Sequence, residues 1–224
     1  MGDEEVEYKA EYLDIAEGAD PEIANWLPRP GKARVIYAGG SSFEGTFNGE
    51  RIKEGAGKYT WMKAAEEDGE EPQVNAIYEG NYTDGKKGGV GKMTYPNGDA
   101  YTGHWKANVM DGEGTYVYKA TGDIYSGTWM ANRKSGHGIY QFGADDSTMR
   151  GTWVDGSITE GEWIFKDGTV YTGRFDGGRP AGEGTFAFQS GITQSGRFEV
   201  RVSAEEEEEG PPALLWRGES VVAC

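Results

Sequence analysis

Residues 101–123 read YTGHWKANVMDGEGTYVYKATGD, and this unit decides the fold. Side chains alternate across a β-strand, so Tyr101, Gly103 and Trp105 share one face of a first strand. The second glycine and both tyrosines of GEGTYVY share one face of a second strand in the same way. The unit is therefore predicted to be a β-hairpin with one aromatic face and one polar face.

The opening pattern of this unit, aromatic-x-Gly-x-aromatic, returns along most of the chain. Its central glycines follow one another at steps of 22–24 residues, except for a first step of 35. These glycines are Gly45, Gly80, Gly103, Gly127, Gly151, Gly173 and Gly196. A fixed period in the twenties marks a repeat array, and a lone hairpin is only marginally stable in water. We therefore predict an all-β fold, an elongated and twisted array of stacked antiparallel β-hairpins over residues 37–198.

The central glycines are predicted to be structural. Gly103 leaves a vacant place on the aromatic face, and we expect a ring from an adjacent hairpin to lie there against the backbone. A side chain at this position would push the stacked hairpins apart. Glycine is thus required despite an entropic cost of about 0.5–1 kcal/mol.

The second strands carry aromatic residues after their glycines, and these are the candidate partner-binding residues. A groove too wide for its own side chains to fill leaves apolar surface, and such surface marks binding sites. The predicted groove residues are Tyr59, Trp61, Tyr95, Tyr116, Tyr118, Tyr140, Phe142, Trp163, Phe165, Phe186 and Phe188.

Two hairpins depart from the pattern. The first holds an insertion, residues 62–75, which we expect to project as an acidic loop and which explains the long first step. The fifth opens with Met149 in place of tyrosine and is one residue shorter. This fifth hairpin is the predicted place for a bend or an altered groove.

The net charge of −16 lies mainly outside the repeats. Residues 1–36 hold nine acids and four bases, residues 62–77 five and one, and residues 199–224 seven and two. Such acidity repels nucleic acid and anionic lipid within about 8 Å at physiological salt. We therefore expect partners with basic surface, no nucleic acid, and a membrane only as the less favoured alternative.

The flanking segments, residues 1–36 and 199–224, are predicted to be acidic extensions. The first has a charged stretch with helical character and then a proline-flanked segment that serves as a docking segment or as a cap on the first hairpin. The second has a polyglutamate spacer before an apolar triplet, which is either a peptide anchor or an ordinary tail. The candidate anchor residues are Trp26, Leu27, Leu214, Leu215 and Trp216.

We predict neither catalytic residues nor a metal or cofactor. The two histidines, His104 and His137, fall on the polar face, and the one cysteine is Cys224. This set cannot assemble a zinc site or a Cys-His nucleophile. The acidic amino terminus has no apolar run, and no segment approaches the ~18 apolar residues of a membrane span. These features favour the cytoplasm.

Residues 78–100, YEGNYTDGKKGGVGKMTYPNGDA, resemble the MORN repeat, with departures at Tyr82 and Met93. The resemblance covers about residues 37–198, as six full repeats and a seventh opening strand. It implies a non-catalytic scaffold. Among small proteins made almost wholly of MORN repeats with acidic tails, the resemblance points to the radial spoke head MORN proteins of cilia and flagella. This implies axonemal partners, including a second MORN protein or another copy of this chain, and a place in the cytoskeleton of the axoneme.

Two alternatives stay open within this resemblance. One is a membrane-apposed or phospholipid-binding adaptor that uses basic linkers at Lys86, Lys87, Arg133 and Lys134, with Arg179 in a similar linker. The other is a scaffold of a different cytoskeletal complex, such as the central apparatus. Some MORN arrays precede enzyme domains, but only 26 residues follow Phe198, so we expect no catalytic domain.

Overall fold

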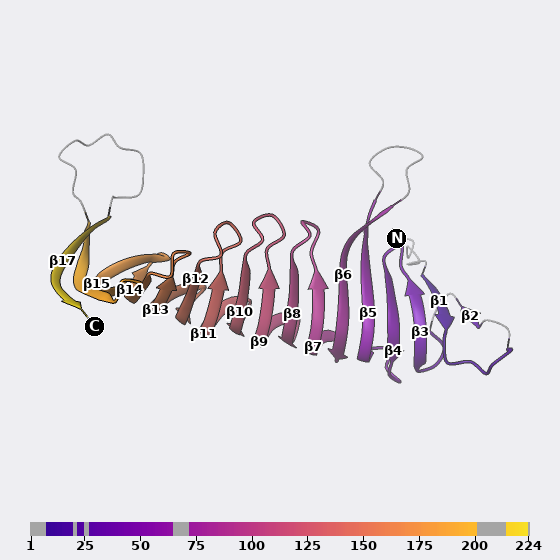
Figure 1. Ribbon diagram of the computed structural model, residues 1–224. Coiled ribbons are helices and arrows are strands. Elements are labelled where there is room, and N and C mark those ends of the chain that lie inside the picture. Colours follow the sequence, from indigo (N-terminus) through magenta and orange to yellow (C-terminus); the bar gives the residue numbers. More distant parts are fainter. Residues whose placement is uncertain (1–7, 20–21, 25–26, 65–71, 201–213, 224) are drawn as a thin grey trace, which may run out of the picture. The chain divides into compact units, whose positions relative to one another are not determined.

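The computed structural model describes residues 8–19, 22–24, 27–64, 72–200 and 214–223, and these residues form strands and turns without helices (Figure 1). The chain divides into two compact units, residues 1–120 and 121–224. Each unit is an open antiparallel sheet in which successive strands lie side by side. The predicted all-β class of stacked hairpins is confirmed.

The first unit contains nine strands among its described residues. They are β1 (Lys9–Tyr12), β2 (Ile23–Ala24), β3 (Gly31–Ile36), β4 (Ser42–Phe47), β5 (Lys53–Lys63), β6 (Gln73–Thr83), β7 (Lys86–Thr94), β8 (Ala100–Lys106) and β9 (Val109–Val117). Strand β1 pairs with both β2 and β3, and from β3 onward each strand pairs with the next.

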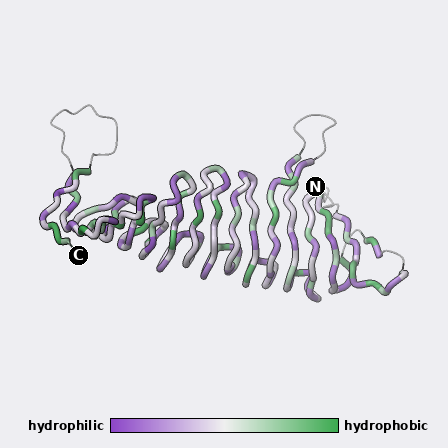
Figure 2. The backbone as a smooth tube through the Cα atoms, in the orientation of Figure 1, coloured by the Kyte–Doolittle hydropathy of each residue, from purple (hydrophilic) through white to green (hydrophobic). Residues whose placement is uncertain are grey.

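The second unit contains eight described strands, which pair in chain order. They are β10 (Ile124–Met130), β11 (Arg133–Gln141), β12 (Thr148–Val154), β13 (Ser157–Ile164), β14 (Val170–Asp176), β15 (Arg179–Ala187), β16 (Ile192–Val200) and β17 (Leu214–Ala223). Polar and apolar residues are interspersed along these strands, as Figure 2 shows for both units.

The central glycines face one another across each hairpin. Gly103 pairs with Gly114, and the same register joins Gly45 to Gly57. A ring fills the space above each of these pairs. A Cβ on Gly103, for example, would lie 2.6 Å from the hydroxyl oxygen of Tyr101. A side chain at these positions would therefore collide with the ring or with the paired strand.

The source of this ring corrects the sequence prediction. The ring over Gly103 and Gly114 comes from Tyr101 of the same hairpin, not from an adjacent one. The Tyr101 side chain folds forward over its own strand, and its hydroxyl donates to the carbonyl oxygen of His104 at 3.0 Å. The same contact with the residue three positions on is made by Tyr78, Tyr125 and Tyr171.

The core consists of the first-strand rings. The opening aromatic residues, among them Tyr78, Tyr101 and Tyr125, are fully buried. Neighbouring hairpins meet through T-shaped ring pairs, such as Tyr78 with Trp105 at 5.4 Å between centroids. The Trp105 indole N–H also donates to the carbonyl oxygen of Gly91 at 3.1 Å. Aromatic pairs of this geometry add about 0.5–1.5 kcal/mol beyond the burial of their area.

The fifth hairpin keeps the same strand pairing but has a different side chain in its core. Met149 is buried in place of a tyrosine ring, and Gly151 still pairs with Gly161. A Cβ on either glycine would meet the opposite backbone instead of a ring. The packing is therefore altered here, and the bend stays a prediction.

The sheets extend into both predicted extensions. At the amino end β1 is a strand, so the expectation of helical character is wrong over these residues. Leu27 is buried and its N–H donates to the Tyr8 hydroxyl at 3.2 Å, whereas Trp26 lies outside the described residues. At the carboxy end β17 pairs with β16, so the seventh opening strand belongs to a complete hairpin.

The first and last residues of the insertion in the first hairpin belong to β-strands. Met62 pairs with Val74 and Lys63 pairs with Gln73, so the ends of the insertion lengthen β5 and β6. Its acidic residues fall within residues 65–71, which lie outside the described residues. The projecting acidic loop therefore stays a prediction.

Candidate partner-binding face

The predicted groove residues lie on the aromatic face of each unit and are much less buried than the core rings. All eleven are half-buried except Phe188, which is 39% exposed. Five pairs of neighbouring rings lie at the ends of second strands, with the second ring of four pairs on the residue after the strand. These pairs are Tyr59–Trp61, Tyr116–Tyr118, Tyr140–Phe142, Trp163–Phe165 and Phe186–Phe188. The structure therefore brings the predicted residues together as a partly exposed aromatic surface within each unit.

Turn aspartates hold some of these rings in place. The Tyr116 hydroxyl donates to Asp99 at 2.9 Å, and the Lys119 N–H donates to the same carboxylate at 2.8 Å. Tyr140 and Asp123 repeat this arrangement at 2.6 Å. Sequence reasoning did not assign this role. The signal that could have found it is the constant separation of 17 residues between aspartate and tyrosine.

The hydrogen bonds at Asp99 favour its charged form. Burial of Asp99 opposes ionisation, but donors from Lys119, Tyr116 and Asn97 outweigh it, so the pKa of this carboxyl lies below its ordinary value of 3.8. A depressed carboxyl pKa stabilises the fold above the pKa of the unfolded chain. This contribution is lost as the pH falls through the lower, folded-state pKa.

Asp99→Asn is therefore expected to lower the free energy of unfolding at pH 7 by about 1–2 kcal/mol, because neutral hydrogen bonds are weaker than charged ones. The variant is also expected to lose less stability than the wild type between about pH 5 and pH 2, where the carboxylate is protonated. Urea unfolding across this pH range measures both effects. Tyr116→Phe removes one donor and so depresses the Asp99 pKa less, and its acid-induced loss of stability should be smaller than that of the wild type and complete at a higher pH. If the free energy of unfolding varied with pH in the same way in the wild type and in Asp99→Asn, the role of the Asp99 carboxylate in stability would be contradicted.

Three lysines also lie on the aromatic face, which the sequence did not predict. The Lys87 ammonium is 4.2 Å from the centroid of the Trp105 ring, and the Lys134 ammonium is 4.5 Å from that of Tyr140. Lys53 occupies the equivalent position in the first hairpin, 4.4 Å from the Tyr59 centroid. Lys87 and Lys134 were expected in solvated basic linkers, and that expectation is wrong. The other predicted linker cations, Lys86, Arg133 and Arg179, are exposed as expected.

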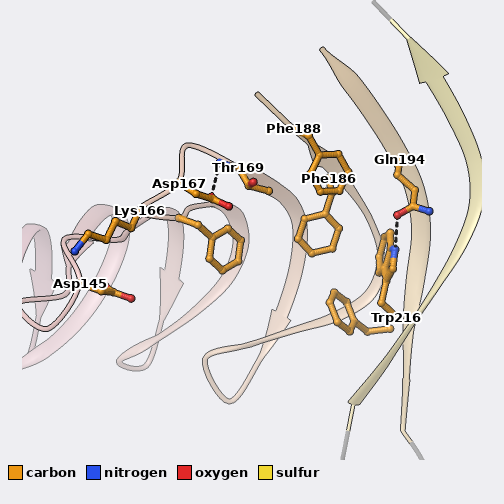
Figure 3. Close-up of a pocket in the computed structure, with 10 residues that line it drawn as sticks. Asp145, Lys166, Asp167, Thr169, Phe186, Phe188, Gln194 and Trp216 are labelled. Atoms are coloured by element: carbon orange, nitrogen blue, oxygen red, sulfur yellow. Dashed lines mark hydrogen bonds between the residues drawn. The ribbon is translucent and has the colours of Figure 1, made fainter. Parts of the chain in front are cut away.

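The second unit also holds an apolar hollow of about 660 Å³ (Figure 3). Phe186, which lines the hollow, and Trp163 of the preceding hairpin occupy the sequence position that holds the tyrosine of a tyrosine–aspartate pair in other hairpins. The Trp163 indole N–H is buried without a hydrogen-bond partner among the described residues. The apolar lining comprises Phe165, Phe186, Phe188, Phe198 and Trp216, and Asp145, Lys166 and Asp167 also border the hollow.

Trp216 packs against its own sheet. Its ring lies 4.9 Å from Phe186 and 5.0 Å from Phe198, and its indole N–H donates to Gln194 at 3.1 Å. It therefore lines the hollow beside three of the predicted groove residues. Sequence reasoning placed Trp216 in a tail because residues 201–213 separate it from β16. Of the other predicted anchors at this end, Leu214 is half-buried and Leu215 is 48% exposed.

Both histidines are exposed, and His104 Nδ1 lies 3.0 Å from the carbonyl oxygen of Glu113. The described residues contain no group of three or more histidine, cysteine, aspartate or glutamate side chains arranged to hold a metal ion. None of the described segments is a helix with the length and apolar character needed to cross a membrane.

Comparison with known proteins identifies the repeat. The family model of the MORN repeat matches residues 78–100, 101–120, 125–147 and 171–193. The hairpins that open at Phe43 and Met149 are outside these matches but share the glycine register. No curated protein matches the chain.

A solved structure also matches the chain. It is described as the SAS-4 (dCPAP) TCP domain in complex with a proline-rich motif of Ana2 (dSTIL) of Drosophila melanogaster. That protein is 12% identical to this one, and the match covers 90% of this chain and 99% of the other, with a TM-score of 0.34.

Proposed function

We propose that this chain, a protein with four MORN repeats, is a non-catalytic scaffold that binds partner proteins through its aromatic face. MORN repeats indicate a structural or interaction role. The observation that supports the proposal most is the row of half-buried ring pairs on the second strands. Apolar side chains that a fold leaves partly exposed in a contiguous patch mark interaction surfaces.

We further propose that the scaffold belongs to the ciliary axoneme, with the radial spoke head as its place. The support is the resemblance of a small repeat array with acidic flanks to the spoke head MORN proteins. A scaffold of another cytoskeletal complex is the nearest rival. The lipid-binding alternative is weaker, because Lys87 and Lys134, two of its four basic residues, lie over aromatic rings.

Fractionation of ciliated cells that express the tagged full chain tests both parts. Wild-type protein is expected to remain with axonemes after non-ionic detergent extraction. The triple variant Trp61→Gln, Phe142→Gln and Phe188→Gln is expected to lose at least about tenfold in retention, because central aromatic residues dominate interface energies. Thermal unfolding of the purified variants verifies that they remain folded.

A matched control removes three apolar side chains from the opposite face. Val90, Ile139 and Val154 are 52%, 49% and 52% exposed, and their replacement by glutamine should leave retention unchanged. Equal loss in both triple variants would contradict a role for the aromatic face. Uniform distribution of the wild type through the cytoplasm would overturn the axonemal assignment.

A further inference from the structure

Two ammonium groups on the aromatic face of the first unit are surrounded by rings. The Lys53 ammonium lies 4.4 Å from the ring centroid of Tyr59, 4.9 Å from that of Phe43 and 5.5 Å from that of Tyr37. The Lys87 ammonium lies 4.2 Å from the ring centroid of Trp105. Neither lysine forms a salt bridge within the described residues.

Cations on the polar face of the same unit behave differently. Arg34 pairs with Glu44 at 2.9 Å and with Glu11 at 3.6 Å, and Lys58 pairs with Glu79 at 3.8 Å. The chain has an excess of acids, yet none of the described ones reaches the two lysines of the aromatic face. The aromatic face of the first unit therefore offers positive charge at Lys53 and Lys87 in a protein of net charge −16, whereas its Asp99 carboxylate is already bonded to Tyr116.

The environment of Lys53 and Lys87 makes an added carboxylate favourable. Burial lowers the pKa of Lys87, and it lowers the pKa of Lys53 to about 8. The surrounding rings offset part of this desolvation by cation–π attraction. A carboxylate that approaches in this partly dry environment would gain more than it would at an exposed lysine.

We propose that the aromatic face of the first unit binds an acidic, apolar segment of a partner protein, whose carboxylates pair with Lys53 and Lys87. The inference rests on the binding role proposed above and specifies the chemistry of the partner. It revises, for this face, the expectation of basic partner surfaces that net charge alone suggested. Apolar side chains of the segment pack on Tyr59, Trp61 and Tyr95 beside the two cations.

The strand order sets the spacing of the two carboxylates. Lys53 is the first residue of β5 and Lys87 the second of β7, so the two lysines are separated by two inter-strand steps. Adjacent strands are ~4.8 Å apart, and Lys53 lies two residues beyond Gly55, the β5 residue that is level with Lys87. With a rise of ~3.3 Å per residue along the strand, the two Cα atoms are about 12 Å apart. In an α-helix with a rise of ~1.5 Å per residue, this distance joins positions about seven or eight residues apart on one face. An amphipathic helix with glutamates at such positions and leucines between them matches this surface.

The chain itself supplies a conservative variant. Lys53 lies across from Phe47, and Lys87 lies across from Tyr82. At the same position of the next hairpin Met110 lies across from an aromatic residue and is 8% exposed. Lys→Met substitutions at both lysines should therefore keep the packing and remove the charge.

Fluorescence anisotropy with the full chain tests the proposal. The probe is a labelled helical peptide of about 18 residues with two glutamates about seven residues apart on a leucine face. The Lys53→Met/Lys87→Met variant is expected to bind it at least about tenfold more weakly, as is typical for loss of a partly desolvated ion pair. A probe with glutamine in place of both glutamates should bind the wild-type protein more weakly by the same factor. The glutamine probe should bind the Lys53→Met/Lys87→Met variant no more weakly than it binds the wild type.

Two controls separate this effect from general electrostatics. Lys58→Met/Lys92→Met removes two exposed lysines of the same unit and should change affinity less than about twofold. Raising the pH from about 7 to about 9.5 should weaken binding of the glutamate probe by the wild type, because Lys53, whose pKa burial lowers to about 8, loses its charge, and the lowered pKa of Lys87 acts in the same direction. The Lys53→Met/Lys87→Met variant should show no such pH dependence.

Failure of this inference is distinguishable from failure of the scaffold proposal. Equal affinity for glutamate and glutamine probes, or no binding of either, overturns the inference. So does Lys53- and Lys87-dependent binding to phosphatidylcholine–phosphatidylserine vesicles without peptide binding. The scaffold proposal stands in each case if the aromatic triple variant still loses its retention on axonemes.

Discussion

Gly103→Ala is expected to destabilise the first unit by about 3 kcal/mol or more, at the upper end of what overpacking costs. The added Cβ would lie 2.6 Å from the carbonyl oxygen of Glu113 and 2.6 Å from the hydroxyl oxygen of Tyr101, and nearer still to the Cα of Gly114. Two of these three obstacles are backbone of the paired strand. They cannot withdraw unless the β8–β9 ladder opens. Urea unfolding followed by circular dichroism measures the loss.

Gly49→Ala is the matched control for this substitution. Gly49 lies in the turn between β4 and β5, no atom lies within 4 Å of its hypothetical Cβ, and its φ is not positive. Alanine should therefore be neutral there or stabilising by up to about 1 kcal/mol, because it restricts the unfolded chain. Similar destabilisation by both substitutions would show that loss of glycine freedom, and not the close approach of Gly103 and Gly114, governs the effect.

The fold was predictable because two independent patterns agree. The period of the central glycines gives the repeat, and the alternation around Gly103 gives the aromatic face. Neither pattern says which ring covers a glycine pair. The forward fold of Tyr101 depends on side-chain torsions and on its hydrogen bond to the His104 carbonyl, which residue spacing does not encode.

The tight turns of the hairpins explain why the lysines were misplaced. The β8–β9 turn is only Ala107 and Asn108, with φ of 48° and 74°. Two positive φ values at adjacent central positions fit a type I′ turn, which usually shows Asn-Gly or Asp-Gly in sequence. Without that signature, the sequence does not reveal how short the connections between paired strands are. The basic-linker prediction therefore included Lys87 and Lys134, whereas both are strand residues, although residues 84–85 do read Asp-Gly.

The residues of the aromatic surface could be predicted from the sequence, whereas the residues of the hollow could be predicted only in part. The ring pairs follow from glycine–aromatic alternation on the second strands, so Tyr59 and Phe186 were found directly. Trp216 joins Phe186 only because β17 returns to β16 across residues 201–213. Pairing across such a gap depends on three-dimensional closure of the sheet, and local pattern carries little information about it.

Trp105→Ala is expected to cost about 4 kcal/mol and to divide the unfolding of the first unit into separate steps. The Trp105 ring contacts Tyr78 of the preceding hairpin at 5.4 Å and Tyr101 of its own at 5.1 Å. Its N–H bonds to the Gly91 carbonyl, so alanine also leaves that acceptor without its donor. Because each hairpin is stabilised by its neighbours, removal of this link should uncouple β6–β7 from β8–β9.

Trp105→Phe separates packing from hydrogen bonding. Phe47 and Phe175 occupy the same position in other hairpins, where they are 4% and 6% exposed, so phenylalanine fits the site. It keeps the T-shaped contacts and loses one hydrogen bond, which costs about 1 kcal/mol. Hydrogen exchange should then show β6–β9 opening together in wild type and in Trp105→Phe, but as two groups in Trp105→Ala. If the alanine variant still opens as one group, hairpin coupling must reside in the backbone ladder between β7 and β8, and the indole must contribute stability without carrying cooperativity.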